Sequence, residues 1–178
     1  MMMSAKSIPT QRKKNTVLAF DPGYERLGIA VIERVGGKDT LIFSDCVHTS
    51  ASLPFANRLH TLGKEAERLI KKFKPTAVAL EKVYFEKNAK TAMQVGEVCG
   101  MLTYIATSSG LPVHLYTPLE VKVATTGYGK SDKQAMAHMV GRLIVLPTKK
   151  RLDDELDAIA VGLTCLASLR YPQAPILK

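Results

Sequence analysis

The sequence predicts an α/β domain in which a mixed five-stranded sheet carries helices on both faces. Two observations support this fold class. Three short runs rich in valine and isoleucine come first and are separated only by turn residues, which indicates an antiparallel meander. Beyond residue 54, apolar runs alternate with amphipathic segments, an order typical of strands joined by helices.

The first half of the chain supplies the meander and one helix. After Pro54, apolar side chains recur at intervals of three and four residues as far as Phe73, opposite a face bearing lysine and glutamate. This periodicity predicts an amphipathic helix that ends by Lys74-Pro75. The strands expected before it are Val17–Phe20, Gly28–Arg34 and Thr40–Thr49.

The second half alternates strands with helices. Ser131 has the residue type of a helix N-cap, so we expect the helix that follows it to begin there. The predicted strands are Thr76–Glu81 and Val113–Tyr116. The predicted helices are Ala89–Ser108, Leu119–Thr125, Ser131–Leu146 and Asp154–Leu169.

Length and composition indicate one globular domain. The chain has 178 residues, of which 46% are hydrophobic, enough for one sizeable core. We expect the domain to occupy residues 16–172, after a disordered basic arm over residues 1–15 and before a tail over residues 173–178. The arm either adds non-specific phosphate contacts or is inert. The net charge of +9 favours attraction to polyanions such as nucleic acids.

Cysteine usage and hydropathy bear on the compartment. Cys46, Cys99 and Cys165 are odd in number and have no CxxC spacing, which is typical of buried thiols in a reducing compartment. No apolar run approaches 18 residues, and the chain does not begin with the apolar core of a secretory signal. We therefore expect a soluble cytoplasmic protein without a membrane partner.

Acidic residues stand at the ends of two predicted strands and at the start of the last helix. Asp21 ends an apolar run at a Pro-Gly turn, Glu81 ends another, and Asp154 and Asp157 open the final helix. Converging carboxylates suit Mg²⁺, a hard cation that prefers oxygen ligands. Two such cations can stabilise both the attacking and the leaving oxygen of a phosphodiester. The pattern indicates a two-metal nuclease.

Each acid also has an ordinary structural explanation. Asp21 before Pro-Gly is a favourable turn residue. Glu81 must be paired, solvated or liganded at the end of an apolar strand, and the adjacent Lys82 points to the opposite face. An aspartate in the first turn of a helix stabilises that helix. Asp157 shares a helical face with both Asp153 and Asp154, so spacing alone does not choose its partner.

Several motifs resemble, in order, those of the RuvC family of Holliday-junction resolvases. They are Phe20-Asp21-Pro22-Gly23 followed by Gly28, the segment from Leu80 to Ala89, and Asp154–Ala160. Between them, Val121-Lys122, the Gly127-Tyr128-Gly129 turn and Ser131-Asp132-Lys133 are similar to the basic segment of that family. The resemblance runs from about Val17 to Leu169.

The resemblance implies a ribonuclease H-like fold and an endonuclease that resolves four-way DNA junctions by paired symmetric nicks. Two Mg²⁺ ions per active site, replaceable by Mn²⁺, would be bound by Asp21, Glu81, Asp154 and Asp157. The family register thus leaves Asp153 as a helix cap. It also implies a homodimer and, as partners, the branch-migration proteins RuvA and RuvB. Gly96 and Gly100 fit such a dimer interface or a tightly packed neighbour within the chain.

The resemblance also suggests DNA contacts. Tyr84 matches an aromatic residue of the family that stacks on bases at the junction centre. The alternative for both Tyr84 and Phe85 is packing beneath their loop, and we expect Phe85 to be partly structural. Lys122 and Lys133 match basic positions that serve the scissile phosphate, and Lys87 is a weaker candidate. The Lys149-Lys150-Arg151 run is either a further contact or a charged loop. Cys99 stands where many family members have arginine.

Three other functions fit parts of the pattern. A ribonuclease H-like nuclease acting on structured RNA would use the same acids. A module that binds junctions without cutting would not need all four of them. A kinase-like domain also places an acid near a glycine after its first strand, but it needs two lobes and therefore a longer chain.

Overall fold

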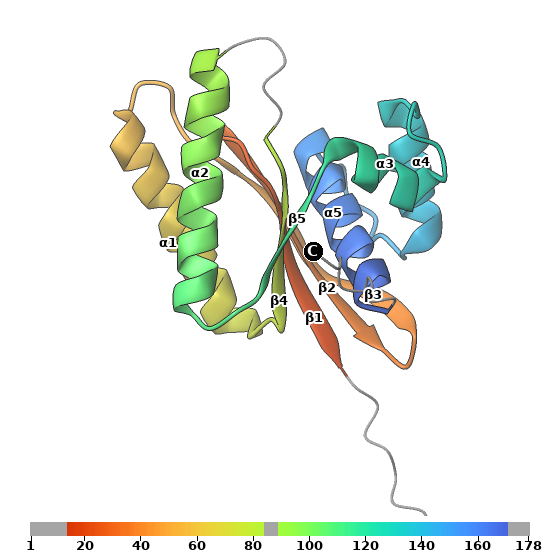
Figure 1. The fold of residues 1–178 in the computed structure, drawn as a ribbon. Helices are drawn as coiled ribbons and strands as arrows, with labels where there is room; N and C mark the ends of the chain where they lie inside the picture. Colours follow the sequence, from red (N-terminus) through yellow and green to blue (C-terminus); the bar gives the residue numbers. More distant parts are fainter. Residues whose placement is uncertain (1–13, 84–88, 171–178) are drawn as a thin grey trace, which may run out of the picture.

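The computed structural model describes residues 14–83 and 89–170 and has layered α/β architecture (Figure 1). Its central sheet has five strands in the order β3-β2-β1-β4-β5. These strands are β3 (Lys38–His48), β2 (Arg26–Val35), β1 (Asn15–Asp21), β4 (Ala77–Glu81) and β5 (Val113–Tyr116). Residues 1–13 of the predicted arm and the whole predicted tail lie outside the described residues.

The sheet is mixed, as predicted. β2 pairs antiparallel with both β1 and β3, whereas β4 pairs parallel with both β1 and β5. Helices α1 (Phe55–Phe73) and α2 (Ala89–Ser108) cover one face, and α5 (Asp153–Arg170) covers the other. Because β1 and β4 are parallel neighbours, their carboxyl ends lie at the same edge of the sheet.

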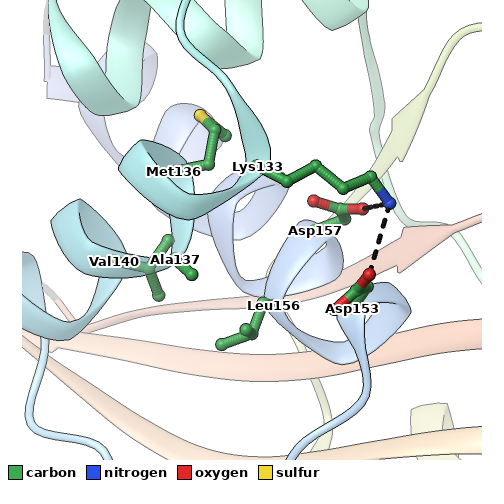
Figure 2. A pocket seen from close by; sticks show the side chains of 7 residues that line it. All are labelled: Lys133, Met136, Ala137, Val140, Asp153, Leu156 and Asp157. Atoms are coloured by element: carbon green, nitrogen blue, oxygen red, sulfur yellow. Dashed lines mark ion pairs between the residues drawn. The ribbon is translucent and has the colours of Figure 1, made fainter.

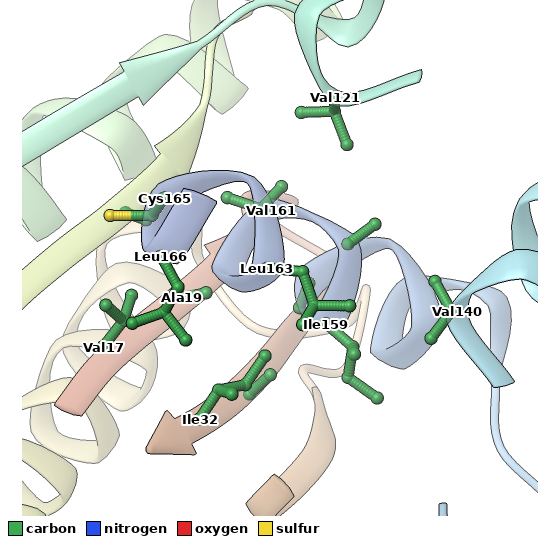
Figure 3. Close-up of a cluster of buried hydrophobic side chains, with 14 of the residues drawn as sticks. Val17, Ala19, Ile32, Val121, Val140, Ile159, Val161, Leu163, Cys165 and Leu166 are labelled. Atoms are coloured by element: carbon green, nitrogen blue, oxygen red, sulfur yellow. The ribbon is translucent and has the colours of Figure 1, made fainter. Parts of the chain in front are cut away.

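Alternation along β1 divides its side chains between two cores. Leu18 and Phe20 pack with α1 and α2, whereas Val17 and Ala19 pack with α5 (Figure 3). The next residue of the same parity as Val17 and Ala19 is Asp21. Its side chain therefore belongs to the face that α5 covers, and the same counting from Ala79 in β4 reaches Glu81.

Two further helices pack on the outer side of α5. Helices α3 (Pro118–Thr126) and α4 (Lys133–Leu143) contact α5 and each other. They contribute Val121, Met136 and Val140 to the core that α5 forms with the sheet. Thr117 caps α3 with a reciprocal capping box, in which its hydroxyl and the Glu120 carboxylate satisfy free backbone N–H groups.

The predicted start of α4 was wrong by one residue. Asp132, rather than Ser131, is the N-cap, and its carboxylate accepts a hydrogen bond of 2.8 Å from the Ala135 backbone N–H. A charged carboxylate is the stronger acceptor. The Ser131 hydroxyl instead donates to the Tyr128 carbonyl at 2.7 Å. The helix also ends at Leu143, because Ile144 turns extended and carries its side chain into the core.

Within residues 14–83 and 89–170, no helix is both long and apolar enough to cross a membrane.

Candidate active site

Two of the predicted acids meet at the carboxyl edge of the sheet. Phe20 in β1 is in register with Leu80 in β4, so the next residues, Asp21 and Glu81, end neighbouring strands. Both side chains belong to the face covered by α5, as the alternation of the strands requires. Strand pairing alone therefore brings together two carboxylates that are 60 residues apart in the sequence.

The first turn of α5 rests directly on β2 at Gly28. Gly28 is the pairing partner of Asp21, and a Cβ atom on it would lie 2.0 Å from the Asp154 carbonyl oxygen. Only a glycine permits this approach. The close packing fixes the rotation of α5 and places its first turn beside the edge that carries Asp21 and Glu81.

That rotation separates the three neighbouring aspartates. The Asp154 side chain is 18% exposed and the Asp157 side chain 34%, whereas the Asp153 side chain is 71% exposed. Asp154 and Asp157 act electrostatically on Asp21, and Asp153 is not among the groups that perturb Asp21. Exposure and electrostatics thus set Asp153 apart from Asp154 and Asp157, and the choice of Asp154 that the family register implies stays a prediction.

The acids repel one another in a partly dry environment. Burial, followed by the charges of Glu81, Asp157 and Asp154, raises the pKa of Asp21 to about 8. Burial and the charge of Asp157 raise the pKa of Glu81 to about 7. Burial is also the main cause that raises the pKa of Asp157. Such a cluster is stable in its ionised form only with added positive charge.

Both predicted lysines face this cluster. The Lys133 ammonium lies 3.6 Å from an Asp153 oxygen and 3.9 Å from an Asp157 oxygen (Figure 2). Its charge opposes the rise in the pKa of Asp21, Glu81 and Asp157. Lys122 acts in the same direction on Glu81 and Asp157. The site thus combines a carboxylate cluster with two cations that could meet a phosphate.

The donor set fits a hard divalent cation that is shared with substrate. Asp154 Oδ2 is buried without a hydrogen-bond donor, and Arg26 approaches it only at 3.4 Å. Among the residues that the structure describes, no three aspartate, glutamate, histidine or cysteine side chains form a ready cage for an ion. Magnesium does not need one, since one or two carboxylates, water and substrate phosphate oxygens commonly complete its shell.

Arg26 is a neighbour of the site that sequence reasoning missed. It precedes Gly28 by two residues in β2, so both residues face α5, and its guanidinium pairs with Asp154. Strand alternation puts Arg26 on the same face of β2 as Gly28, and this is the only sequence feature that points to it. It predicts a contact with Asp154 only when α5 is known to pack on that face.

Cys99 borders the site from α2. Its thiol lies 3.9 Å from the Glu81 carbonyl oxygen. Burial, followed by the charges of Asp21 and Glu81, raises the pKa of the thiol to about 11, so it stays protonated at neutral pH. A neutral group therefore borders the strand-end acids on the α2 side.

The basic run before α5 has a structural role. Lys149 Nζ lies 2.9 Å from a Glu155 oxygen and 3.0 Å from the Ser44 carbonyl oxygen. The Arg151 side chain is 6% exposed, pairs with Glu155 at 3.7 Å and donates to the Pro147 carbonyl. Two cations of the run thus hold the first turn of α5 against β3. Of the two alternatives for the run, the contacts of Lys149 and Arg151 favour a structural loop.

Three of the predicted DNA contacts, Tyr84, Phe85 and Lys87, lie outside the described residues.

Comparison with known proteins identifies a family that this chain matches over most of its length. The family model for crossover junction endodeoxyribonuclease RuvC matches residues 17–165. The crossover junction endodeoxyribonuclease RuvC of Ruminiclostridium cellulolyticum is 37% identical over 147 residues, which are 83% of this chain and 89% of the relative. That of Caldanaerobacter subterraneus is 41% identical with the same coverage.

Solved structures agree with the fold. The chain resembles Thermus thermophilus RuvC in complex with a Holliday junction substrate, with a TM-score of 0.82 and 31% identity. The match covers 88% of this chain and 95% of that one. The yeast mitochondrial Holliday junction resolvase Ydc2 matches with a TM-score of 0.67 at 14% identity, over 93% of this chain and 84% of that one, and supports the fold alone. These resolvase neighbours confirm the ribonuclease H-like fold expected from the resemblance.

Proposed function

The chain belongs to the RuvC family of crossover junction endodeoxyribonucleases, and on that basis we propose that it resolves four-way DNA junctions during homologous recombination and repair. Paired, symmetric nicks in opposing strands are the expected outcome. The proposal rests on one observation: the packing of α5 on Gly28 gathers Asp154 and Asp157 beside the strand-end acids Asp21 and Glu81.

The proposed metal ligands are those four acids, and Mg²⁺ is the proposed cofactor, with two ions per site and Mn²⁺ as a substitute. The charges of the other three acids all act on Asp21. Held by these carboxylates, two such cations would supply an activated water for in-line attack and positive charge for the departing 3′ oxygen, and the products would carry 5′-phosphate and 3′-hydroxyl ends. The protein's own contribution is to hold the four carboxylates close together, where their mutual repulsion favours the binding of cations.

Lys133 and Lys122 are the proposed phosphate contacts. Both carry positive charge toward the carboxylates, so a scissile phosphate held there would meet charges that oppose its own. The proposed contacts at the junction centre are Tyr84 and Phe85, with Lys87 on the neighbouring backbone. Aromatic side chains stack on unpaired bases, worth about 1–3 kcal/mol each.

A homodimer is the proposed assembly. A Cβ atom added to Gly96 or Gly100 in α2 would meet no heavy atom within 4 Å, so no neighbour within the described chain accounts for these glycines. The same helix carries the exposed side chains of Met93 and Tyr104. An isologous dimer would present two sites to opposing strands, which explains why the nicks should be paired.

The family resemblance supplies the rest of the proposed setting. RuvA and RuvB are the proposed partners, and the cytoplasm is the proposed compartment. The division into an arm over residues 1–15, a domain over 16–172 and a tail over 173–178 also remains a proposal.

Cleavage of a mobile synthetic four-way junction tests the function. It should be compared with a matched linear duplex and a structured RNA, with Mg²⁺ or with EDTA. We expect symmetric, Mg²⁺-dependent nicks in the junction alone, and none with Asp21→Asn. The matched pair Asp154→Asn and Asp153→Asn tests the site: the first should abolish cleavage, while the second, in an exposed side chain, should retain most of it.

Other outcomes would assign the chain differently. Tight junction binding without cleavage by the wild-type protein would indicate a binding module. Cleavage of RNA alone would indicate a related nuclease with another substrate. Equal loss in Asp153→Asn and Asp154→Asn would contradict the ligand assignment without affecting the family.

A further inference from the structure

The loop between α3 and α4 presents an exposed aromatic residue between two lysines that act on the candidate active site. Tyr128 lies in this loop and is 61% exposed. Gly127 ends α3 in the left-handed conformation, with φ of 76°. Gly129 lies so close to α3 that an added Cβ atom would be 2.5 Å from Leu119 Cδ1. The two glycines thus fold the loop back on α3 and turn Tyr128 outward.

Hydrogen bonds hold this loop in one shape. The Thr126 hydroxyl donates to the Lys122 carbonyl oxygen at 2.8 Å and accepts from the Tyr128 backbone N–H at 3.1 Å. The Ser131 hydroxyl donates to the Tyr128 carbonyl oxygen at 2.7 Å. Both backbone groups of Tyr128 are therefore satisfied inside the loop. Its ring has no such partner among the described residues and is presented on a fixed support.

The same contacts tie the loop to the carboxylate cluster. Thr126 bonds to the backbone of Lys122, whose charge acts on Glu81 and Asp157. Two residues beyond Ser131, Lys133 reaches Asp157. Tyr128 consequently lies in the connection between Lys122 and Lys133, the two lysines whose charges act on the carboxylate cluster.

The surroundings of the ring suit a polyanion that also offers flat apolar surfaces. Leu119 and Val123 are exposed on α3, and both lie against Gly129 in the loop. Lys130 is exposed in the loop itself, without an acidic partner among the described residues. The one neighbouring acid, Asp132, is engaged as the N-cap of α4. Nucleic acid with unpaired bases matches this combination, because phosphates meet lysines and bases stack on aromatic rings.

We propose that Tyr128 is a nucleic-acid contact of its own, whose ring stacks on an unpaired nucleotide next to the strand held at the carboxylate cluster. Lys130 contacts a phosphate of the same strand. This inference rests on the proposed function, and it adds a contact on the α3–α4 side to those proposed for Tyr84 and Phe85. Such stacking would favour binding of substrates that have unpaired bases near the cleavage site.

Binding measurements in the Asp21→Asn background test the contact without cleavage. Fluorescence anisotropy would compare a four-way junction, a linear duplex and a single-stranded oligonucleotide. Tyr128→Ala should weaken junction and single-strand binding about 5- to 100-fold, the range expected for loss of one stacking contact. Duplex binding should change less than twofold, as expected when no base is open to stack. Tyr128→Phe should retain affinity, because it keeps the ring.

Val145→Ala is the matched control, since Val145 is 82% exposed and lies beyond the opposite end of α4. It should bind all three ligands as the background protein does. Unchanged affinity in Tyr128→Ala, or an equal loss on duplex and on single strand, would overturn the inference. Failure of the background protein to prefer the junction would instead count against the proposed function, while the single-strand comparison would still decide the role of Tyr128.

Discussion

Gly28 and Asp154 are in contact, and this contact joins the sheet to the helix that completes the site. The space for a Cβ atom on Gly28 is already filled by the Asp154 backbone, with its carbonyl oxygen 2.0 Å from the position that the atom would take. Gly28 also pairs with Asp21 in the neighbouring strand β1. It therefore contacts one proposed metal ligand within the sheet and a second, Asp154, in the helix that covers the sheet.

Gly28→Ala should therefore damage the site through geometry rather than chemistry. The added methyl must push the first turn of α5 away from β2, and with it Asp154 and Asp157. We expect junction cleavage to fall at least about 100-fold, since displacements near 1 Å can have effects of that size. Thermal unfolding should also shift downward, because a clash with backbone is not relieved by a side-chain rotation.

Gly141→Ala is the matched control, since a Cβ atom on Gly141 in α4 would meet nothing within 4 Å. Alanine is the better helix former, so this variant should be more stable by about 0.5–1 kcal/mol and cleave normally. Normal cleavage by Gly28→Ala would show that α5 is not fixed by this contact.

The sequence predicted the two strand-end acids because their positions depend only on local sequence. Each acid directly follows a run of apolar residues that is typical of a buried strand, so Asp21 and Glu81 could be located without any tertiary information. The choice between Asp153 and Asp154 depends instead on the rotation of α5, which Gly28 sets from more than a hundred residues away. No helical spacing contains that information, and only the family resemblance supplied it.

The same limit explains the other differences. Arg26 meets Asp154, and Lys149 meets the Ser44 carbonyl, across segments that are distant in the sequence. From sequence alone, a basic run before a helix is indistinguishable from an exposed charged loop, because its burial and its partners depend on tertiary packing. The N-cap of α4 was misplaced because Ser131 and Asp132 are both good capping residues, and the choice depended on Ser131 being engaged by the Tyr128 carbonyl.

The electrostatics of Asp21 predict how the stability of the metal-free protein depends on pH. Its pKa rises from 3.8 to about 8 on folding, so between these values the folded state binds a proton that the unfolded chain has released. The free energy of unfolding must then fall as the pH rises through this window. Asp21→Asn removes the charge and should remove this part of the dependence.

Differential scanning fluorimetry in EDTA, from pH 4 to pH 8, measures this effect. At pH 8 the melting temperature of Asp21→Asn should exceed that of the wild type by roughly 3–10 °C, corresponding to about 1–3 kcal/mol at this chain length. Near pH 4 the two should converge. Asp153→Asn, in an exposed side chain, is the control and should follow the wild type. Parallel curves for Asp21→Asn and the wild type would contradict the raised pKa.

Glu155 should be a stability residue although it lies between two proposed metal ligands. Its carboxylate is buried and neutralises Lys149 and Arg151. Glu155→Ala leaves both cations near β3 without their partner, which typically destabilises a protein by about 3–5 kcal/mol. Urea denaturation should show a lower midpoint. Glu67→Gln, in an exposed pair with Lys64, should leave the midpoint unchanged and provides the comparison.

A substitution at Lys133 can distinguish an effect on metal binding from an effect on phosphate binding. Its ammonium lies beside Asp157 and lowers the pKa of the neighbouring acids, so it competes with cations for the same carboxylates. Lys133→Met should therefore leave the Mg²⁺ concentration for half-maximal cleavage unchanged or lower. The rate at saturating Mg²⁺ should fall roughly 100-fold, because a positive charge near the scissile phosphate is lost.

Single-turnover cleavage across a Mg²⁺ titration distinguishes the two effects. Lys38→Met is a suitable control, since this exposed lysine is the first residue of β3 and lies beside the end of α4 opposite Lys133. It removes the same charge and should change neither quantity. Full recovery of Lys133→Met at high Mg²⁺ would mean that Lys133 orders the carboxylates rather than the phosphate. In that case Lys122, the second cation facing Glu81, would become the principal candidate for the phosphate contact.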